Sequence, residues 1–177
     1  MLCAVSHLKI KENYNDILTI IIPRHVDRVK KIIEELLKFN LSIVLYSKLS
    51  QMDTTTDILL VDSYGEALKF YNISKCVFLG KSLVKSLIKD GGQNPIEPAR
   101  LGCKILHGPY VSNFAETYEY LRKLGITKKI NNSNELSLSL VEEFKEDKAK
   151  NQEIAAKIEN YGQNIFNNVI IELKKYI

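Results

Sequence analysis

The stretch ILTIII at residues 17–22 is an unbroken apolar run, and it ends directly at the polar triplet PRH at residues 23–25. Four more short apolar runs follow along the chain, and most of them are continuous rather than alternating: SIVLY (42–46), ILLV (58–61), CVFL (76–79) and KILH (104–107). Strands that are buried on both faces have this pattern, as in a parallel sheet covered by helices. The sequence therefore predicts a set of buried parallel strands.

Amphipathic segments separate these runs. DRVKKIIEELLKFN (27–40) carries its apolar residues on one face, which predicts a helix. SYGEALKFYN (63–72) opens with Ser63 and Glu66 at the spacing of a capping box, and NFAETYEYLRKLG (113–125) repeats that spacing with Asn113 and Glu116. The alternation of strand and helix predicts an α/β fold with a doubly wound parallel sheet.

The two ends of the chain differ from this pattern. From residue 135 to residue 177 there is no strand signal, and two helices are predicted there. At the front, MLCAVSH is apolar and is interpreted as the end of a strand belonging to a larger architecture. We expect residues 1–177 to form one nucleotide-binding domain with a helical tail.

Composition excludes several classes of protein. The net charge of +4 is scattered and arginine is scarce, so nothing indicates nucleic-acid binding. Cys3, Cys76 and Cys103 form no CxxC pair and predict reduced thiols in a cytoplasmic protein. No apolar run reaches the ~20 residues of a membrane span. Three separated histidines without an HExxH or CxxC motif predict no metal site, and neither a GxSxG elbow nor a Walker loop is present.

Ligands of doubly wound sheets bind at the carboxyl ends of the strands. In this chain that rule selects four loops, which are PRH (23–25), DSYGE (62–66), the glycine-containing segment 80–97 and GPYVSNF (108–114). Arg24 directly follows a strand, where an arginine could bind a phosphate or a carboxylate. The plainer interpretation is that Arg24 and His25 are surface residues after a strand. His107, at the end of a strand, is interpreted as a hydrogen-bonded core residue.

GGQNPIEPARLG at residues 91–102 supports two interpretations. In the structural one, Asn94 caps a helix, Pro95 takes its first position and Glu97 completes a capping box. In the functional one, the glycines let an anion approach the backbone at a helix N-terminus, and Glu97 accepts hydrogen bonds from ribose hydroxyls. Both interpretations use the same geometry and do not exclude each other.

Taken together, IIIPRH, DSYGE, FLGKSLV, GGQNPIEPARLG and GPYVSNFAE resemble, in this order and roughly at these spacings, the C-terminal half of the bacterial 3-deoxy-D-manno-octulosonic acid (Kdo) transferases. The resemblance implies a Rossmann-like C-terminal domain of a GT-B glycosyltransferase, which binds the donor CMP-Kdo. It also implies an inverting transfer of Kdo to a lipid A precursor in lipopolysaccharide biosynthesis, with no cofactor and no metal. The acceptor site, the membrane contact at the cytoplasmic face of the inner membrane and the catalytic base would belong to an N-terminal domain that is absent from this sequence.

The resemblance also implies which residues bind the donor. Arg24 matches the arginine of the PRH motif, and Glu97 is expected on the cytidine ribose. The remaining matches belong to a loop near the phosphate, to the glycine loop and to the GP…NF motif: Ser63, Gly65, Glu66, Gly91, Gly92, Asn94 and Asn113. No catalytic residue can be assigned.

This sequence also departs from the family pattern. Gln93 stands where a histidine is usual, Lys81 replaces a glycine, Val26 replaces a proline, and residues 85–90 form a longer link. Two other hypotheses therefore stay open. One is a decayed or stand-alone relative that keeps the fold and at most weak nucleotide binding and transfers nothing. The weaker one is another GT-B member, such as a nucleotide-sugar epimerase or a glycosyltransferase with a UDP donor. We expect CMP or CMP-Kdo as partner, and lipid A precursor only through the N-terminal domain.

Overall fold

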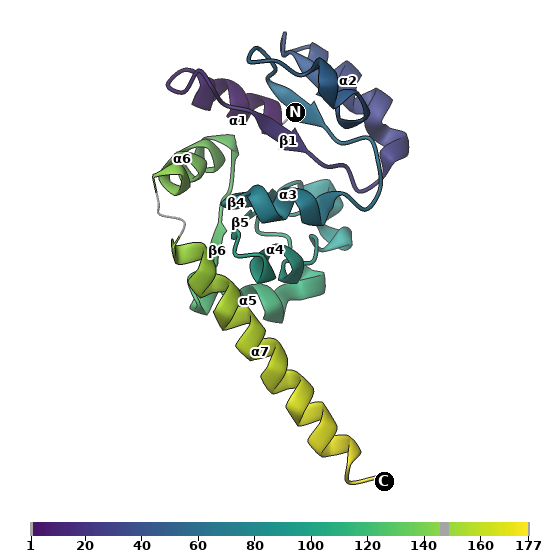
Figure 1. The fold of residues 1–177 in the computed structure, drawn as a ribbon, viewed down its shortest axis with the longest axis vertical. Coiled ribbons are helices and arrows are strands. Elements are labelled where there is room, and N and C mark those ends of the chain that lie inside the picture. Colours follow the sequence, from purple (N-terminus) through teal and green to yellow (C-terminus); the bar gives the residue numbers. More distant parts are fainter. Residues whose placement is uncertain (1, 146–148, 177) are drawn as a thin grey trace. The chain divides into compact units, whose positions relative to one another are not determined.

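The structure, a computed structural model, describes residues 2–145 and 149–176 (Figure 1). The chain divides into two compact units. Unit 1 comprises Met1–Phe70 and Asn132–Val141, and unit 2 comprises Tyr71–Asn131 and Glu142–Ile177. Each unit contains a three-stranded parallel sheet, so the prediction of an α/β fold with parallel strands is confirmed.

Unit 1 has the strand order β1-β3-β2, with β3 (Ile58–Leu60) paired in parallel with both neighbours. All three residues of β3 are buried, as the continuous apolar run ILLV predicts for a central strand. The other elements of this unit are α1 (Leu2–Lys11), β1 (Thr19–Ile21), α2 (Val29–Leu37), β2 (Ile43–Leu45) and the 3-10 segments η1 (Val26–Arg28) and η2 (Tyr46–Gln51).

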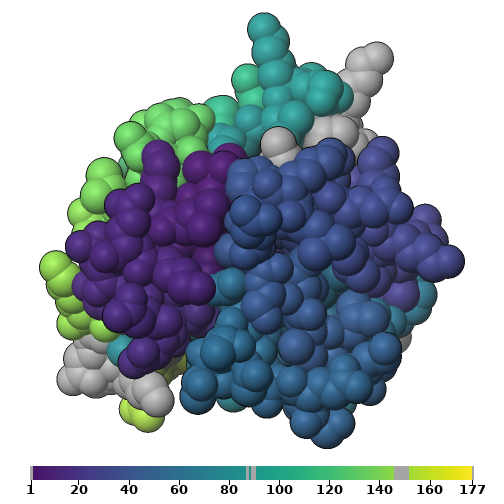
Figure 2. Space-filling view, turned by 90° about the horizontal axis from the view of Figure 1, so that it is seen from above, coloured from purple at the N-terminus to yellow at the C-terminus, as the bar shows by residue number. Residues whose placement is uncertain are grey.

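The N-terminal segment is a helix, α1, and the interpretation of MLCAVSH as the end of a strand is wrong. Ala4 is fully buried and packs with Leu36, Leu41 and Ile58. Figure 2 shows this purple segment side by side with the blue residues of unit 1. A run of apolar residues is compatible with a strand or a helix until the residues that pack against it are known. Besides these apolar contacts, α1 makes polar contacts with the sheet.

These polar contacts form a buried network at the amino ends of β1 and β3. His7, 1% exposed, bonds through Nδ1 to Thr19 Oγ1 at 2.9 Å and through Nε2 to Asp57 Oδ1 at 3.1 Å. Lys11 also donates to Asp57 Oδ1, and the Ser42 N–H donates to Asp57 Oδ2 at 2.9 Å. Burial opposes ionisation of Asp57, but these hydrogen bonds outweigh it and hold its pKa below the ordinary value. The network therefore fixes α1 on the sheet through a charged carboxylate.

Unit 2 has the strand order β4-β5-β6, again parallel throughout. Its elements are β4 (Cys76–Leu79), the 3-10 segments η3 (Lys85–Asp90) and η4 (Ser112–Phe114), α4 (Ile96–Arg100), β5 (Lys104–His107), α5 (Ala115–Lys123), β6 (Thr127–Lys129) and α7 (Ala149–Leu173). β6 was not among the predicted strands. Its residues Lys128 and Lys129 are exposed, so the segment lacks the apolar run on which the prediction depended.

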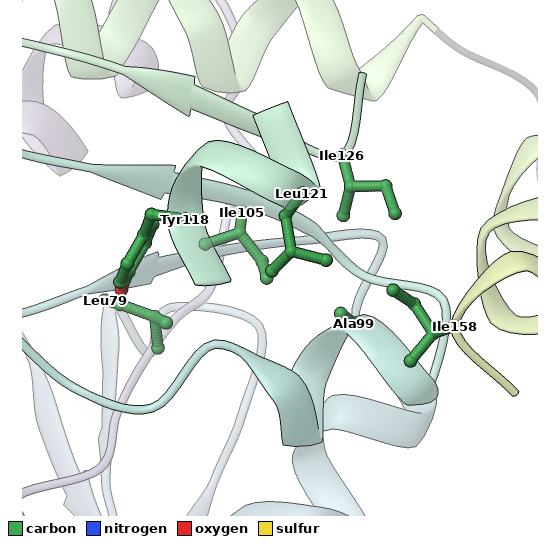
Figure 3. Close-up of a cluster of buried hydrophobic side chains, with 7 residues drawn as sticks. All are labelled: Leu79, Ala99, Ile105, Tyr118, Leu121, Ile126 and Ile158. Atoms are coloured by element: carbon green, nitrogen blue, oxygen red, sulfur yellow. The ribbon is translucent and has the colours of Figure 1, made fainter. Parts of the chain in front are cut away.

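The core of unit 2 is an apolar cluster between the sheet, α4, α5 and α7. Figure 3 shows its side chains converging from these elements: Leu79, Ala99, Ile105, Tyr118, Leu121, Ile126 and Ile158. Ile158 of α7 is 2% exposed and Tyr161 stacks on Tyr120 with ring centroids 3.9 Å apart. The first half of α7 therefore belongs to this core.

Two helices, α3 (Ala67–Ile73) and α6 (Ser133–Phe144), have residues in both units. The helices predicted in the tail are α6 and α7, and both are present. None of the described helices is both long enough and apolar enough to cross a membrane.

The capping boxes predicted for α3 and α5 are not formed. α3 begins at Ala67, after Glu66, so Ser63 and Glu66 do not cap it. α5 begins at Ala115 after the turn η4, and its N-cap residue is Phe114, without a side-chain cap. The chain winds through a 3-10 turn before α5, which shifts the helix start past the predicted Asn113. Gly125, with φ of 73°, ends α5 as predicted.

Candidate functional site

The carboxyl ends of the three strands of unit 1 bring the loops after β1, β2 and β3 to one edge of the sheet. The Asp62 carboxylate joins two of these loops. It accepts the Ser47 N–H at 2.9 Å and the Ser47 hydroxyl at 2.6 Å. The bond from the Ser47 side chain is the main reason why the pKa of Asp62 lies below its ordinary value. The third loop is joined by Tyr64, whose hydroxyl oxygen accepts the Val26 N–H at 3.4 Å.

Four predicted donor residues lie at this edge. Arg24 is exposed on the loop after β1. On the loop after β3, Ser63 Oγ is buried and has no hydrogen-bond partner among the described residues. Gly65 has φ of 83°, and Lys69 Nζ lies 2.7 Å from Glu66 Oε2 as an ion pair. The edge thus combines a guanidinium, an unpartnered hydroxyl and a carboxylate whose charge is balanced by a lysine.

In unit 2, Ser82 joins the loops that follow β4 and β5. Its buried hydroxyl donates to the Leu79 carbonyl at 2.6 Å and accepts the Gly108 N–H at 2.8 Å. The Tyr110 N–H donates to the Ser82 carbonyl at 2.8 Å. The GP…NF loop is therefore fixed to the end of β4.

The glycine loop packs against the GP…NF loop. Gly91 and Gly92 have φ of 60° and 81°, and a Cβ on Gly91 would lie 2.4 Å from Asn113 Cγ. Only glycine fits this close approach. The structure therefore brings the glycine loop and the GP…NF loop, two of the predicted ligand loops, into contact.

The helix after the glycine loop is short. It begins at Ile96, and its N-cap residue is Pro95, without a side-chain cap, so the predicted capping box with Asn94 as N-cap and Pro95 at the first helical position is not formed. Asn94 Oδ1 accepts the Ile96 N–H at 3.0 Å just before the helix. α4 has five residues, with Glu97 in its first turn. Asn94 and Glu97 are both exposed, which leaves the Glu97 carboxylate accessible to a ligand.

Tyr118 of α5 contacts the glycine loop, and the sequence did not identify it as a candidate site residue. Its hydroxyl donates to the Gln93 carbonyl at 2.9 Å, and its ring lies against His107 with centroids 4.4 Å apart. His107 Nδ1 bonds to the Gly108 carbonyl at 2.7 Å. Burial lowers the pKa of His107 below its ordinary value, which favours a neutral ring and confirms its interpretation as a hydrogen-bonded core histidine.

Two further features are the buried thiol of Cys103 and the arrangement of metal-ligating side chains. Burial raises the pKa of Cys103 to about 11, and its thiol donates to the Tyr71 and Ser74 carbonyls. A thiol with this pKa is a poor nucleophile at neutral pH. Within residues 2–145 and 149–176, no three His, Cys, Asp or Glu side chains are grouped so as to hold a metal ion.

Comparison with known proteins gives a consistent pattern, although no protein-family model matches the chain. The chain is 32% identical over 116 residues to the 3-deoxy-D-manno-octulosonic acid transferase of Haemophilus influenzae, covering 66% of this chain and 26% of that protein. For the transferase of the same name from Aquifex aeolicus the identity is 28% over 134 residues, covering 76% of this chain and 35% of that protein.

A third relative is a bifunctional glycosyltransferase/methyltransferase of Fusobacterium nucleatum, 30% identical over 149 residues that cover 83% of this chain and 22% of that protein. The chain thus spans between 22% and 35% of the length of these three relatives. The predicted resemblance to the Kdo transferases is confirmed by these alignments.

Among solved structures, the chain is similar to the C-terminal CMP-Kdo binding domain of WaaA from Acinetobacter baumannii. The TM-score is 0.78 at 23% identity, covering 88% of this chain and 80% of that chain. This likeness confirms the predicted Rossmann-like fold.

Proposed function

We propose that this chain is the donor-binding half of a Kdo transferase, which binds CMP-Kdo for transfer of Kdo to a lipid A precursor. The observation that carries the proposal is the alignment of 66% to 76% of the chain with two curated Kdo transferases. The loops that the resemblance marks lie at the carboxyl ends of the parallel strands of each unit, where such folds bind ligands.

In unit 2, the glycine loop and α4 would bind the nucleotide. Gly91 and Gly92 are buried against the GP…NF loop and fix the course of the glycine loop. The exposed Glu97 carboxylate can accept two hydrogen bonds from vicinal ribose hydroxyls. Tyr118 holds the Gln93 carbonyl, so the loop is pre-organised before the ligand arrives.

In unit 1, Arg24 and Ser63 are the residues that the resemblance assigns to the donor. CMP-Kdo carries a phosphate and a sugar carboxylate, and an exposed guanidinium suits either group. The Ser63 hydroxyl is buried and has no hydrogen-bond partner among the described residues, so its donor is unused. Glu66, paired with Lys69, fits a sugar hydroxyl better than a phosphate, because its remaining oxygen is a hydrogen-bond acceptor.

The base that deprotonates the acceptor hydroxyl would come from the N-terminal half of the intact transferase, which would work at the cytoplasmic face of the inner membrane. The chain alone would then bind the donor and transfer nothing. No metal and no cofactor is required in this proposal. A non-catalytic nucleotide-binding relic is the second candidate, favoured by Gln93 at a position where the family pattern has histidine.

Titration of CMP into the isotopically labelled chain, followed by amide NMR shifts, tests donor binding. We expect shifts in the glycine loop and a loss of about 1–3 kcal/mol of binding free energy in Glu97→Ala, which is about 5- to 150-fold in Kd. Glu116→Ala, which removes another exposed carboxylate in the first turn of α5, should bind CMP as the wild type does. Absent shifts, or equal affinity in Glu97→Ala, would contradict the proposal.

A turnover assay separates the transferase half from the relic. We expect the chain alone to release no CMP from CMP-Kdo in the presence of lipid A precursor. Addition of the N-terminal half of a related transferase should restore release if the donor site is functional. CMP binding without any restored turnover would favour the relic, and turnover by the chain alone would refute the placement of the base in another half.

A further inference from the structure

Tyr118 of α5 is held rigidly in the core of unit 2. Its side chain is 2% exposed and belongs to the apolar cluster that also contains Leu79 and Ile105 (Figure 3). The ring lies against His107, with centroids 4.4 Å apart, and His107 is itself bonded to the Gly108 carbonyl. Because a ring packed in this way cannot turn freely, the position of its hydroxyl is fixed.

The Tyr118 hydroxyl sets the orientation of one peptide group in the glycine loop. It donates to the Gln93 carbonyl at 2.9 Å, and burial raises the pKa of Tyr118 above its ordinary value, so the hydroxyl keeps its proton. Within the described residues no peptide bond is cis, and in a planar trans peptide the C=O and the following N–H point in opposite directions. Since the Gln93 carbonyl points toward the core residue Tyr118, the Asn94 N–H points away from the core.

The Asn94 N–H is a donor that a ligand can reach. Asn94 is exposed, and its N–H makes no hydrogen bond to any residue of 2–145 or 149–176. The next two residues offer no such donor, because Pro95 has no N–H and the Ile96 N–H is bonded to Asn94 Oδ1 at 3.0 Å. The turn therefore presents one backbone donor, three residues before the accepting carboxylate of Glu97.

We propose that Tyr118 is a positioning residue of the donor site, which fixes the Gln93–Asn94 peptide so that the Asn94 N–H donates to a phosphate oxygen of the nucleotide. This inference rests on the proposed function and deepens it, because it gives the phosphate a contact in unit 2. Ribose hydroxyls can donate to the Glu97 carboxylate, whereas an ionised phosphate only accepts and needs a donor such as an N–H.

A structural role alone would have a different signature. If the Tyr118 hydroxyl only stabilised unit 2, its loss would affect the binding of every nucleotide or nucleoside to the same degree. If it positions the Asn94 N–H, its loss weakens the binding of ligands that carry a phosphate and spares the nucleoside. CMP and cytidine differ only in that phosphate.

Amide NMR titration of the isotopically labelled chain with CMP and with cytidine tests the proposal. In the wild type, we expect CMP but not cytidine to shift the Asn94 amide proton downfield, because only CMP offers a phosphate oxygen. Tyr118→Phe removes the hydroxyl and keeps the ring. It should weaken CMP binding roughly three- to tenfold and cytidine binding by less than about twofold, since one hydrogen bond to the phosphate is loosened.

Tyr120→Phe is the matched control. It makes the same change in the same helix, at a ring that stacks on Tyr161 and whose hydroxyl has no hydrogen bond among the described residues, so it should bind CMP as the wild type does. Nitrogen-15 relaxation without ligand gives a second readout. The Asn94 amide should move more in Tyr118→Phe than in the wild type or in Tyr120→Phe.

The outcomes separate this inference from the proposed function. Wild-type CMP affinity in Tyr118→Phe, an equal loss for CMP and cytidine, or unchanged motion of the Asn94 amide would overturn the positioning role and leave the proposed function standing. The same holds if CMP shifts the Glu97 amide but not that of Asn94. A wild type that binds no CMP would overturn both.

Discussion

Units 1 and 2 have the same architecture, three parallel strands with a buried central strand, but each attaches its outer helix by different means. α1 is fixed in unit 1 by the charged network of His7, Lys11 and Asp57 as well as by Ala4. α7 is fixed in unit 2 by apolar side chains and by the stacking of Tyr161 on Tyr120. A hydrogen-bonded network specifies one position of a helix and depends on each member, whereas apolar packing tolerates more substitution.

Asp57→Ala in unit 1 tests this difference between polar and apolar attachment, and we expect it to have the largest effect on stability. The substitution leaves buried His7 without one partner and the Ser42 N–H unpaired, so we expect a loss of about 3 kcal/mol in the free energy of unfolding. Amide hydrogen exchange of β1 and β3 measures it. Asp16→Ala, on an exposed carboxylate, should change stability by less than about 0.5 kcal/mol. A cost under 1 kcal/mol for Asp57→Ala would show that apolar packing alone holds α1.

Substitution of one glycine in each unit, Gly91 and Gly65, compares how closely the candidate ligand loops are packed. Gly91 and Gly65 both have positive φ, but only a Cβ at Gly91 meets other atoms within 4 Å, the nearest being Asn113 Cγ at 2.4 Å. We expect Gly91→Ala to cost about 2–3 kcal/mol and Gly65→Ala about 1 kcal/mol, measured by urea unfolding. Equal costs would mean that the GP…NF loop yields easily to a side chain at residue 91.

The smallest effect is a pH dependence in unit 2. Burial lowers the folded-state pKa of His107 below its ordinary value of 6.5, so the unfolded state binds the proton first. Stability is then complete above about pH 6.5 and falls as the pH drops through the folded pKa, by at most about 1.4 kcal/mol per pH unit. Unfolding between pH 7.5 and 5 measures this slope, which His107→Asn should reduce.

His25→Asn is the matched control, because His25 is exposed. It should keep the slope of the wild type. The Asp57 carboxylate of unit 1 should respond in a different range, because its pKa is also lowered but from an ordinary value near 4. Its contribution is lost only as the pH falls below about 4. A slope between pH 7.5 and 5 that is the same in His107→Asn and in the wild type would contradict the assignment to His107.

Much of the fold could be predicted because its signals are local. The continuous apolar runs contain the strands β1 to β5, and the segment 27–40 contains α2. β6 escaped prediction because its pairing partner β5 and its place in the sheet, rather than its own side chains, make it a strand. α1 was misread for a similar reason, since the partners of its polar side chains lie at residues 19, 57 and 133.

Some features of the candidate site could likewise be predicted from local sequence signals, and others could not. The sequence by itself determined the residue types and their order in the loops, and it selected Arg24, Asn94 and Glu97, because ligand loops follow strands and because capping and glycine signals are short-range. Only the tertiary structure decided that Asn113 lies against Gly91, that Tyr118 supports Gln93, and that Ser47 fixes Asp62. These contacts join residues 15 to 25 positions apart, and side chains so separated meet only after the parallel strands have brought their loops to a common edge.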